Sequence, residues 1–242
     1  MNRFKALLRR ILAVMDDWLF PERVTCLCCS QALGEEEEDG LCPACARALE
    51  RLNAQQEERE QSSEALTLPE GIGFVHAAYP YRDQVRRLVH RLKFESIRAA
   101  AVPLARPMAY LPAGEEELIV PVPTDAQRKR KRGYNQATLL AQHIAKELGM
   151  PMEEALTRVK RCGPQTGLSF KERHTNLIGC MAASDAVNGK RILLVDDVYT
   201  SGATVSEAAR ALYAAGARSV GVFVAARAGL HDDDYSEPFP VK

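Results

Sequence analysis

Near the C-terminus the chain reads Arg191-Ile192-Leu193-Leu194-Val195-Asp196-Asp197-Val198-Tyr199-Thr200-Ser201-Gly202-Ala203-Thr204. The run from Ile192 to Val195 is apolar without alternation, which is typical of a strand that is covered on both faces in a parallel sheet. Two acids, Asp196 and Asp197, follow where we expect that strand to end, and a turn of small and hydroxyl-bearing residues comes next. The pattern predicts a buried strand that delivers two carboxylates to a tight turn.

The residues after this turn complete a strand–helix–strand unit. Apolar residues recur at helical spacing through 205–212, and a second buried strand is expected over 219–226. The alternation of strands and helices begins earlier in the chain. We expect a strand or hairpin over 74–79, a short strand over 118–123 and a helix over 137–148. This alternation predicts an α/β fold with a Rossmann-type parallel sheet and helices on both faces.

The turn after the acids is suited to an anion. Small residues let the backbone approach an anion closely, and the first N–H groups of the following helix point at it. Hydroxyls at Thr200, Ser201 and Thr204 add donors. Because adjacent carboxylates repel a bare phosphate, we expect Asp196 and Asp197 to meet vicinal sugar hydroxyls, which together predicts a ribose 5-phosphate ligand. The alternative is a solvated acidic loop followed by an ordinary helix N-cap.

The composition is that of an ordinary folded protein. The chain has 242 residues, of which 46% are hydrophobic and 26% charged, with 15 glycines and 13 prolines. These values exclude a wholly disordered, collagen-like or disulfide-scaffold chain, and no uncharged run approaches the ~20 residues of a membrane span. The 32 basic and 32 acidic residues cancel, so bulk charge neither favours nor excludes a nucleic acid partner.

Five of the seven cysteines lie within the first 45 residues. Cys26 and Cys29 form one C-x2-C pair, and after twelve residues Cys42 and Cys45 form a second. This is the ligand spacing of a zinc ribbon, in which two knuckles complete a tetrahedral four-thiolate site. Zinc would supply the folding free energy that so short a module cannot obtain from a core. The alternatives are a redox C-x-x-C or unbound thiols, and Cys28 competes with Cys29 as a ligand.

We expect five segments along the chain. In the first segment, apolar residues recur at near-helical spacing, which predicts an amphipathic helix docked on the protein. The alternative is a membrane-surface anchor. Because no export signal is recognisable in this segment, we expect a cytoplasmic protein with reduced thiols. The expected order is the helix at 1–22, the small zinc-ribbon module at 23–50, a polar linker at 51–70, the α/β domain at 71–228 and an acidic tail at 229–242.

Two sets of motifs carry a resemblance to known families. The stretch from Ile192 to Thr204 resembles the PRPP-binding signature of type I phosphoribosyltransferases, where PRPP is 5-phosphoribosyl-1-pyrophosphate. The chain more particularly resembles the ComF family, named for competence. The motifs shared with that family are the four-cysteine module, Val120-Pro121-Val122-Pro123, Arg132-Gly133-Tyr134-Asn135-Gln136, and Gln165-Thr166-x-Leu168 with Arg173 and Asn176. The segment Gly179-Cys180-Met181 departs from the family pattern of Gly, a small residue and Phe.

The resemblance implies a type I phosphoribosyltransferase-like domain over 71–228, with a role for each matching segment. Asp196 and Asp197 would act catalytically by holding the ribose 2- and 3-hydroxyls. The 5-phosphate would be bound by Thr200, Ser201, Gly202, Ala203 and Thr204. The pyrophosphate would lie along Pro121, Val122, Pro123, Thr124 and Asp125.

The resemblance also implies a mobile loop and a metal. Residues 165–176 would close over the site, with Lys171 and Arg173 as candidate catalytic cations. Magnesium would bridge pyrophosphate and ribose oxygens, since it binds through substrate phosphates and a few waters.

Three functions are compatible with this resemblance. The first is an active phosphoribosyltransferase, which would displace pyrophosphate from the ribose anomeric carbon through an oxocarbenium-like transition state. The second is a protein that senses PRPP without turnover. The third is a protein of natural competence, DNA uptake or utilisation, in which the zinc module and the basic run Arg128–Arg132 contact single-stranded DNA or partner proteins such as a helicase and a recombination mediator. By itself a basic run of this kind indicates a solvated loop, and the acceptor substrate is not visible in the sequence.

Overall fold

The structure is a computed structural model that describes residues 25–34, 38–61, 68–159 and 179–228. The helix expected over 1–22 and the acidic tail expected over 229–242 lie outside these residues. Within the described part of the chain, no helix combines the length and the apolar character needed to cross a membrane.

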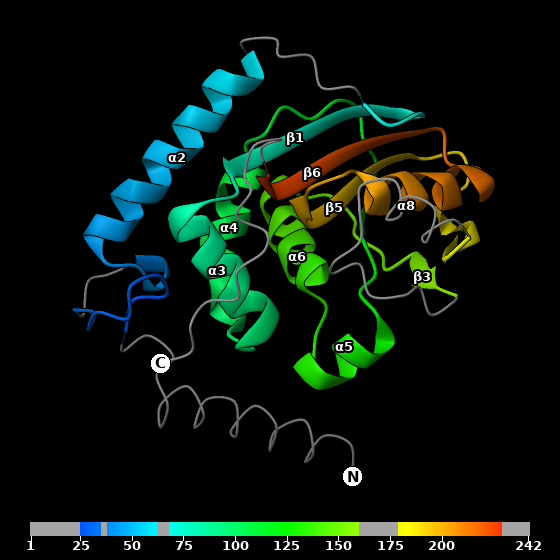
Figure 1. The fold of residues 1–242 in the computed structure, drawn as a ribbon. Coiled ribbons are helices and arrows are strands. Elements are labelled where there is room, and N and C mark those ends of the chain that lie inside the picture. The colour runs from blue at the N-terminus through cyan, green and yellow to red at the C-terminus, as the bar shows by residue number, and fades with distance from the viewer. Residues whose placement is uncertain (1–24, 35–37, 62–67, 160–178, 229–242) are drawn as a thin grey trace.

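A four-stranded parallel sheet forms the centre of the fold (Figure 1). In spatial order its strands are β1 (Ile72–Pro80), β6 (Ser219–Arg227), β5 (Arg191–Tyr199) and β2 (Leu118–Pro121). Residues 74–79 therefore lie in one strand and form no hairpin, because β1 pairs in parallel with the last strand of the chain. The sheet confirms the predicted α/β fold.

Alternate residues of β5 pack on opposite faces of this sheet. Leu193 and Val195 belong to a hydrophobic cluster on the face covered by α3 (Asp83–Phe94), α4 (Ala101–Met108) and α6 (Gln136–Leu148). Ile192 and Leu194 belong to a second cluster, on the face of α8 (Ala203–Ala214) and the small antiparallel pair β3 (Leu156–Arg158) and β4 (Met181–Ala183). Both faces of β5 are covered, which is why its sequence lacks alternation.

The two acids lie inside β5 and not after it. Strand β2 ends at Pro121, opposite Val195, whereas β5 continues to Tyr199 beside β6 with Asp196 opposite Val224. The expectation that the strand stops at Val195 is wrong, because β6 keeps pairing with β5 after β2 has left it. The acids therefore border the place where β5 has lost one neighbour.

The basic run is helical and not a loop. Helix α5 covers Ala126–Arg132, with Asp125 as its N-cap and Gly133 as its left-handed C-cap. These two caps bracket the run and override the tendency of like charges to stay unfolded. The remaining short elements are the 3-10 turns η1 (Glu38–Gly40), η2 (Arg98–Ala100) and η3 (Asp185–Val187).

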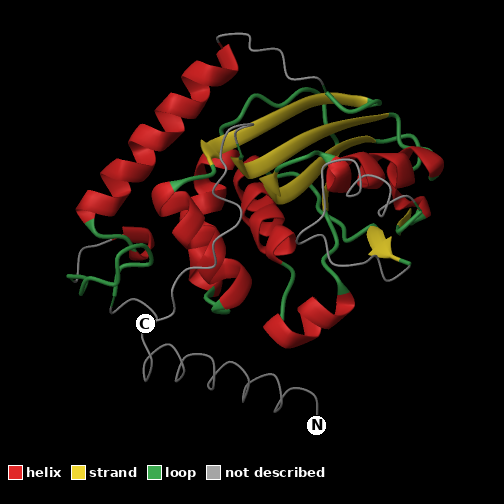
Figure 2. Ribbon diagram, viewed as in Figure 1, coloured by secondary structure: helices red, strands yellow, loops and turns green. Residues whose placement is uncertain are grey.

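Helix α2 (Pro43–Gln61) runs beside the sheet along β1 (Figure 2). It includes residues 51–61, where the sequence predicts the start of a polar linker. Asn53 Nδ2 donates to the Ala78 carbonyl at 2.8 Å, and Glu60 Oε1 accepts from the Ala77 N–H at 2.8 Å. Because β1 is an edge strand, these polar side chains cover a sheet edge. The residues that suggest a linker thus have a packing role.

Candidate ligand site and metal centre

Asp196 and Asp197 have different neighbours, because consecutive side chains of a strand point to opposite faces. Asp197 is buried on the side of α3 and α6, where Lys93 Nζ lies 2.7 Å from its Oδ1 and Gln136 Nε2 donates to its Oδ2 at 2.9 Å. Asp196 is half-buried, and Arg158 of β3 is a cation that acts on it from the other face. The sheet thus divides two acids that are adjacent in sequence.

The charged groups of this cluster shift one another's pKa values. Burial and the charge of Asp197 raise the pKa of Asp196 to about 7, although the Asp197 N–H donates to Asp196 Oδ1 at 2.8 Å. Burial alone would lower the pKa of Lys93, but the charge of Asp197 raises it. Lys93 is therefore an ammonium, while the Asp196 carboxyl titrates near neutral pH and gains from any ligand that donates a hydrogen bond to its ionised form.

The turn after β5 depends on one glycine. Gly202 has a φ of +76°, and a Cβ built on it would lie 2.6 Å from Tyr199 Oη. Helix α8 begins at the next residue, and the Ser206 N–H donates to the Gly202 carbonyl at 2.8 Å. Thr200 is exposed and Thr204 half-buried beside this turn. The tight turn and the helix N-terminus predicted from the sequence are both present.

The segment Pro121 to Asp125 leaves the sheet beside the acids, because Pro121 pairs with Val195. Its backbone is tied down by two side chains, since Asn135 Nδ2 donates to the Val122 carbonyl and Arg158 Nε to the Pro123 carbonyl, both at 2.9 Å. The Asp125 carboxylate caps α5, with one oxygen accepting from the N–H groups of the second and third helical residues at 2.8 and 3.3 Å. This side chain thus serves the helix, and a ligand would meet the backbone of the segment.

The motif Arg132-Gly133-Tyr134-Asn135-Gln136 connects the parts of the site. Tyr134 Oη donates to the Leu92 carbonyl of α3 at 2.7 Å. Asn135 holds the segment after β2 and Gln136 holds Asp197, as described above. The Nε and Nη1 atoms of Arg132 are buried and have no hydrogen-bond partner among the residues that the structure describes. Burial lowers the pKa of this guanidinium.

Sequence reasoning missed Lys93 and Arg158 as members of the site and gave Gln136 no role of its own. No motif surrounds Lys93 or Arg158, and their approach to the acids depends on how α3 and β3 pack. Gln136 stands in a motif, but only the fold shows what its amide contacts. The candidate cations Lys171 and Arg173 lie outside the described residues.

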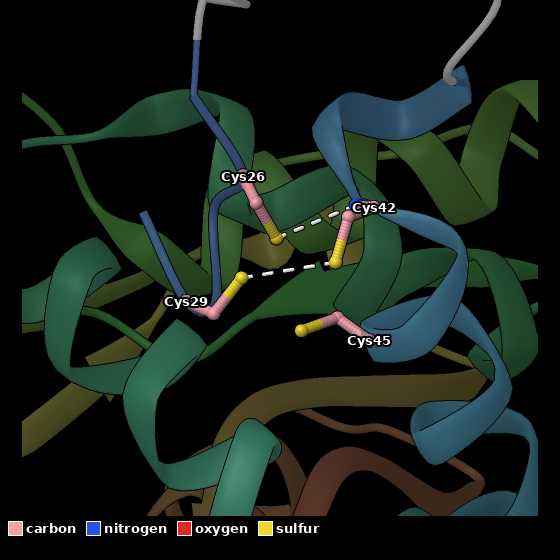
Figure 3. A group of neighbouring side chains, drawn as sticks. All are labelled: Cys26, Cys29, Cys42 and Cys45. Atoms are coloured by element: carbon pink, nitrogen blue, oxygen red, sulfur yellow. Dashed lines mark hydrogen bonds between the residues drawn. The ribbon is translucent and has the colours of Figure 1, made fainter. Parts of the chain in front are cut away.

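The four cysteines of the two C-x2-C pairs meet at a second site (Figure 3). The sulfur atoms of Cys26, Cys29, Cys42 and Cys45 all lie within 4.8 Å of one another, and those of Cys29 and Cys42 are 3.7 Å apart. Four sulfurs at ~2.3 Å from a tetrahedral zinc ion are about 3.8 Å apart. The cluster therefore has the donor set and the size of a structural zinc site.

Backbone donors distinguish the Cys26 thiol from that of Cys28. The N–H groups of Cys28 and Cys42 each donate to Cys26 Sγ at 3.4 Å. Although burial opposes it, such backbone bonds lower the pKa of the Cys26 thiol to about 7, as suits a metal ligand. Cys28 Sγ instead donates to the Gln84 carbonyl at 3.9 Å, and burial raises its pKa to about 12. The structure thus places Cys29, and not Cys28, in the cluster.

The four-cysteine cluster is attached to α3. Arg91 Nη1 donates to the Cys26 carbonyl at 3.2 Å, and its Nη2 donates to Ser30 Oγ at 2.6 Å. Leu27 and Leu49 of the cysteine module belong to the same hydrophobic cluster as the residues of β5 that face α3. The module is therefore packed onto the sheet domain and shares its core.

Comparisons with known proteins find relatives of this chain. Residues 135–237 match the family model described as the phosphoribosyl transferase domain. Competence protein F of Haemophilus influenzae is 34% identical over 161 residues, which cover 61% of this chain and 70% of that protein. DNA utilization protein YhgH of Salmonella typhimurium is 36% identical over 156 residues, covering 61% and 69%. Competence protein ComFC of Bacillus subtilis is 27% identical over 220 residues, covering 86% of each chain.

Proposed function

The chain belongs to the ComF family of competence protein F and DNA utilization protein YhgH, and on this premise we propose that it binds PRPP at the C-terminal end of β5. One observation carries the proposal. Two carboxylates stand where β5 loses its β2 neighbour, and the turn that follows opens directly onto the N-terminus of α8. The two hydroxyls and the 5-phosphate of a ribose 5-phosphate match this order, in which the carboxylates come first and the turn with the helix N-terminus follows.

Each part of PRPP has a chemically suitable place. Asp196 and Asp197 accept the ribose hydroxyls, residues 200–204 take the 5-phosphate, and the backbone of 121–125 takes the pyrophosphate. Lys93 and Gln136 already contact both oxygens of Asp197, so magnesium would be held by the ligand's phosphates and by waters. When bound, magnesium would stabilise negative charge on the pyrophosphate leaving group.

The proposed reaction is transfer of the phosphoribosyl group. Pyrophosphate would leave the anomeric carbon as an acceptor attacks it, with positive charge developing on the ribose ring beside the two carboxylates. A protein that senses PRPP without turnover would use the same site. Release of pyrophosphate in the presence of bases and amines distinguishes the two, since only the transferase produces it.

The binding proposal is tested by Asp196→Asn, which leaves the Lys93–Asp197 ion pair in place. A carboxylate that accepts a ribose hydroxyl makes a charge-assisted bond worth about 1.5–3 kcal/mol, so calorimetry with PRPP and magnesium should show about 10- to 100-fold weaker binding. The melting temperature should stay unchanged or rise, because the substitution removes repulsion between the acids. A folded variant with unchanged affinity would contradict the proposal, as would a wild type that does not bind PRPP.

A second candidate function is contact with single-stranded DNA during DNA uptake. Helix α5 presents four exposed cations, Arg128, Lys129, Arg130 and Lys131. Phe94, which is 71% exposed, is the last residue of α3, and Tyr134, two residues after α5, donates to the Leu92 carbonyl of the same helix. A basic helix and an exposed aromatic ring are the two kinds of group that bind single strands by charge and stacking. The function predicts salt-dependent binding of an oligonucleotide.

The four-cysteine cluster completes the proposal. We assign it one structural zinc ion, held by Cys26, Cys29, Cys42 and Cys45. A closed site of four thiolates leaves no coordination position for a substrate. Its proposed role is to fix the module on α3, or to offer a surface to proteins of the DNA-uptake machinery.

A further inference from the structure

Lys93 is a half-buried cation of the site. It stands near the C-terminal end of α3, its side chain is 24% exposed, and its Nζ pairs with the Asp197 carboxylate, which is 7% exposed. Lysines avoid such positions unless a partner offsets the cost of desolvation. The pairing residue is one of the two acids that the proposed function assigns to the ligand, so Lys93 has a direct effect on the group that would bind it.

The positive charge of Lys93 offsets the repulsion between the two neighbouring carboxylates. Burial and the charge of Asp197 raise the pKa of Asp196, while Lys93 and Arg158 act in the opposite direction. Without an ammonium beside Asp197, the two acids would keep a shared proton to higher pH than they do with Lys93 in place. A protonated carboxyl carries an O–H donor and has fewer acceptor positions for sugar hydroxyls.

The contacts also orient Asp197. An ionised carboxylate has about four acceptor positions, and Lys93 and Gln136 take one on each oxygen. Both oxygens are thereby fixed, and the remaining acceptor positions are available to a donor from a ligand. A divalent cation that approached Oδ1 would be repelled by the ammonium charge of Lys93, which lies 2.7 Å from that oxygen.

We infer that Lys93 is a positioning residue of the ligand site, which orients the Asp197 carboxylate and places a positive charge beside the acid pair, so that Asp197 accepts a ribose hydroxyl and not a metal ion. This inference rests on the proposed function and adds the residue that sets the charge of the site. The charged and titratable groups that surround the pair from the packed elements are Asp196 on β5, Tyr81 after β1, Arg132 at the end of α5 and Arg158 on β3.

The first test compares Lys93→Met and Lys93→Arg with wild type and with the control Lys146→Met, which removes an exposed lysine of α6. Affinity for PRPP with magnesium is measured by calorimetry from pH 6 to pH 9. Lys93→Met should bind about tenfold or more weakly at pH 7 and recover as the pH rises, because without the ammonium the pKa of Asp196 is raised further and the acid pair keeps its proton to higher pH. The affinity of Lys93→Arg should stay within about threefold of wild type and should keep the wild-type pH profile, because arginine retains the positive charge. The control Lys146→Met should match wild type in both.

A purely structural role for Lys93 gives a different pattern. It would lower the melting temperature and the affinity of Lys93→Met equally at every pH, and Lys93→Arg, with a bulkier head group, would rescue neither. That result would overturn the inference, as would wild-type affinity and pH profile in Lys93→Met.

The second test needs no ligand. Carbon-13 labelling of aspartate side chains allows the Asp196 and Asp197 carboxyl carbons to be titrated by NMR, with Asp196→Asn assigning the signals. Lys93→Met should raise the titration midpoint of the pair relative to wild type and to Lys146→Met, whereas identical midpoints would overturn the inference. If wild type does not bind PRPP, the proposed function fails, and this titration still decides whether Lys93 controls the charge of the acids.

Discussion

At the scale of single residues, the site contains two adjacent aspartates that cannot be told apart from the sequence but have different surroundings in the structure. Asp196 and Asp197 are chemically identical neighbours, but one titrates near pH 7 and the other is held by Lys93 and Gln136. The difference arises because a strand directs consecutive side chains into different surroundings. Replacing both acids together would therefore combine two effects, since loss of Asp197 also leaves the half-buried ammonium group of Lys93 without its counter-ion.

Gly202→Ala tests the turn that would hold the phosphate. Alanine must adopt a left-handed φ, which costs about 1–2 kcal/mol, and its Cβ would lie 2.6 Å from Tyr199 Oη. We expect denaturant unfolding to show a loss of stability larger than this backbone cost, together with weaker binding of PRPP. The matched control is Gly149→Ala, because Gly149 has a φ of +63° and no atom within 4 Å of the added Cβ. Equal losses in both variants would show that Tyr199 yields without cost.

At the scale of elements, polar helices carry roles that their composition conceals. Helix α2 looks like a linker in sequence, but Asn53 and Glu60 bind backbone groups of the edge strand β1. Helix α5 looks like a charged loop, but Asp125 and Gly133 cap it at both ends. In each case a few specific hydrogen bonds decide the structure of a segment with little to bury.

Neutralising α5 tests the second candidate function. Replacing Arg128, Lys129, Arg130 and Lys131 by alanine should weaken binding of a single-stranded oligonucleotide and flatten its salt dependence by about 0.7 in log–log slope for each phosphate that the variant no longer neutralises. Fluorescence anisotropy across a range of salt concentrations measures both quantities. Arg132 is left intact because it is partly buried at the ligand site.

Two further variants separate charge from stacking in that experiment. Phe94→Ala should lower affinity without changing the salt slope, because the ring adds stacking and no charge. Arg47→Ala with Arg51→Ala removes exposed charges from α2 and should leave both quantities unchanged. An α5 variant with the wild-type slope would remove single-stranded DNA from the proposal and leave partner proteins as the role of α5.

At the scale of the whole molecule, the cysteine module and the sheet share one core. Leu27, Leu49 and Leu52 belong to the same hydrophobic cluster as Leu193 and Phe223 of the sheet. The module thus has no core of its own, and the metal that closes it should stabilise the packed unit as a whole. A module joined by a linker would instead melt separately.

Metal removal tests this arrangement. Cys42→Ser, or chelation of the wild type, should remove one zinc ion per chain and lower the melting temperature of a single calorimetric transition by about 10 °C or more, because structural zinc contributes folding free energy. Zinc content is measured by elemental analysis of the same samples. A full complement of zinc in Cys42→Ser would contradict the ligand assignment. A main transition that keeps its temperature after zinc loss would contradict the shared core.

The sequence by itself determined what depends on local pattern. The apolar run from Ile192 to Val195 specified a strand covered on both faces, the residues up to Thr204 specified a tight turn into a helix, and the spacing of the cysteines specified a four-thiolate cluster. These features follow from backbone period, side-chain size and ligand spacing, which act over a few neighbouring residues.

Only the tertiary structure decided which distant residues meet. Lys93 and Asp197 are more than a hundred positions apart, and their ion pair exists because α3 packs on one face of β5. The strand order β1-β6-β5-β2 and the extension of β5 beyond β2 likewise depend on pairing between remote segments. Such contacts are set by the packing of the whole chain, whereas periodicity reports only which face of each element is buried.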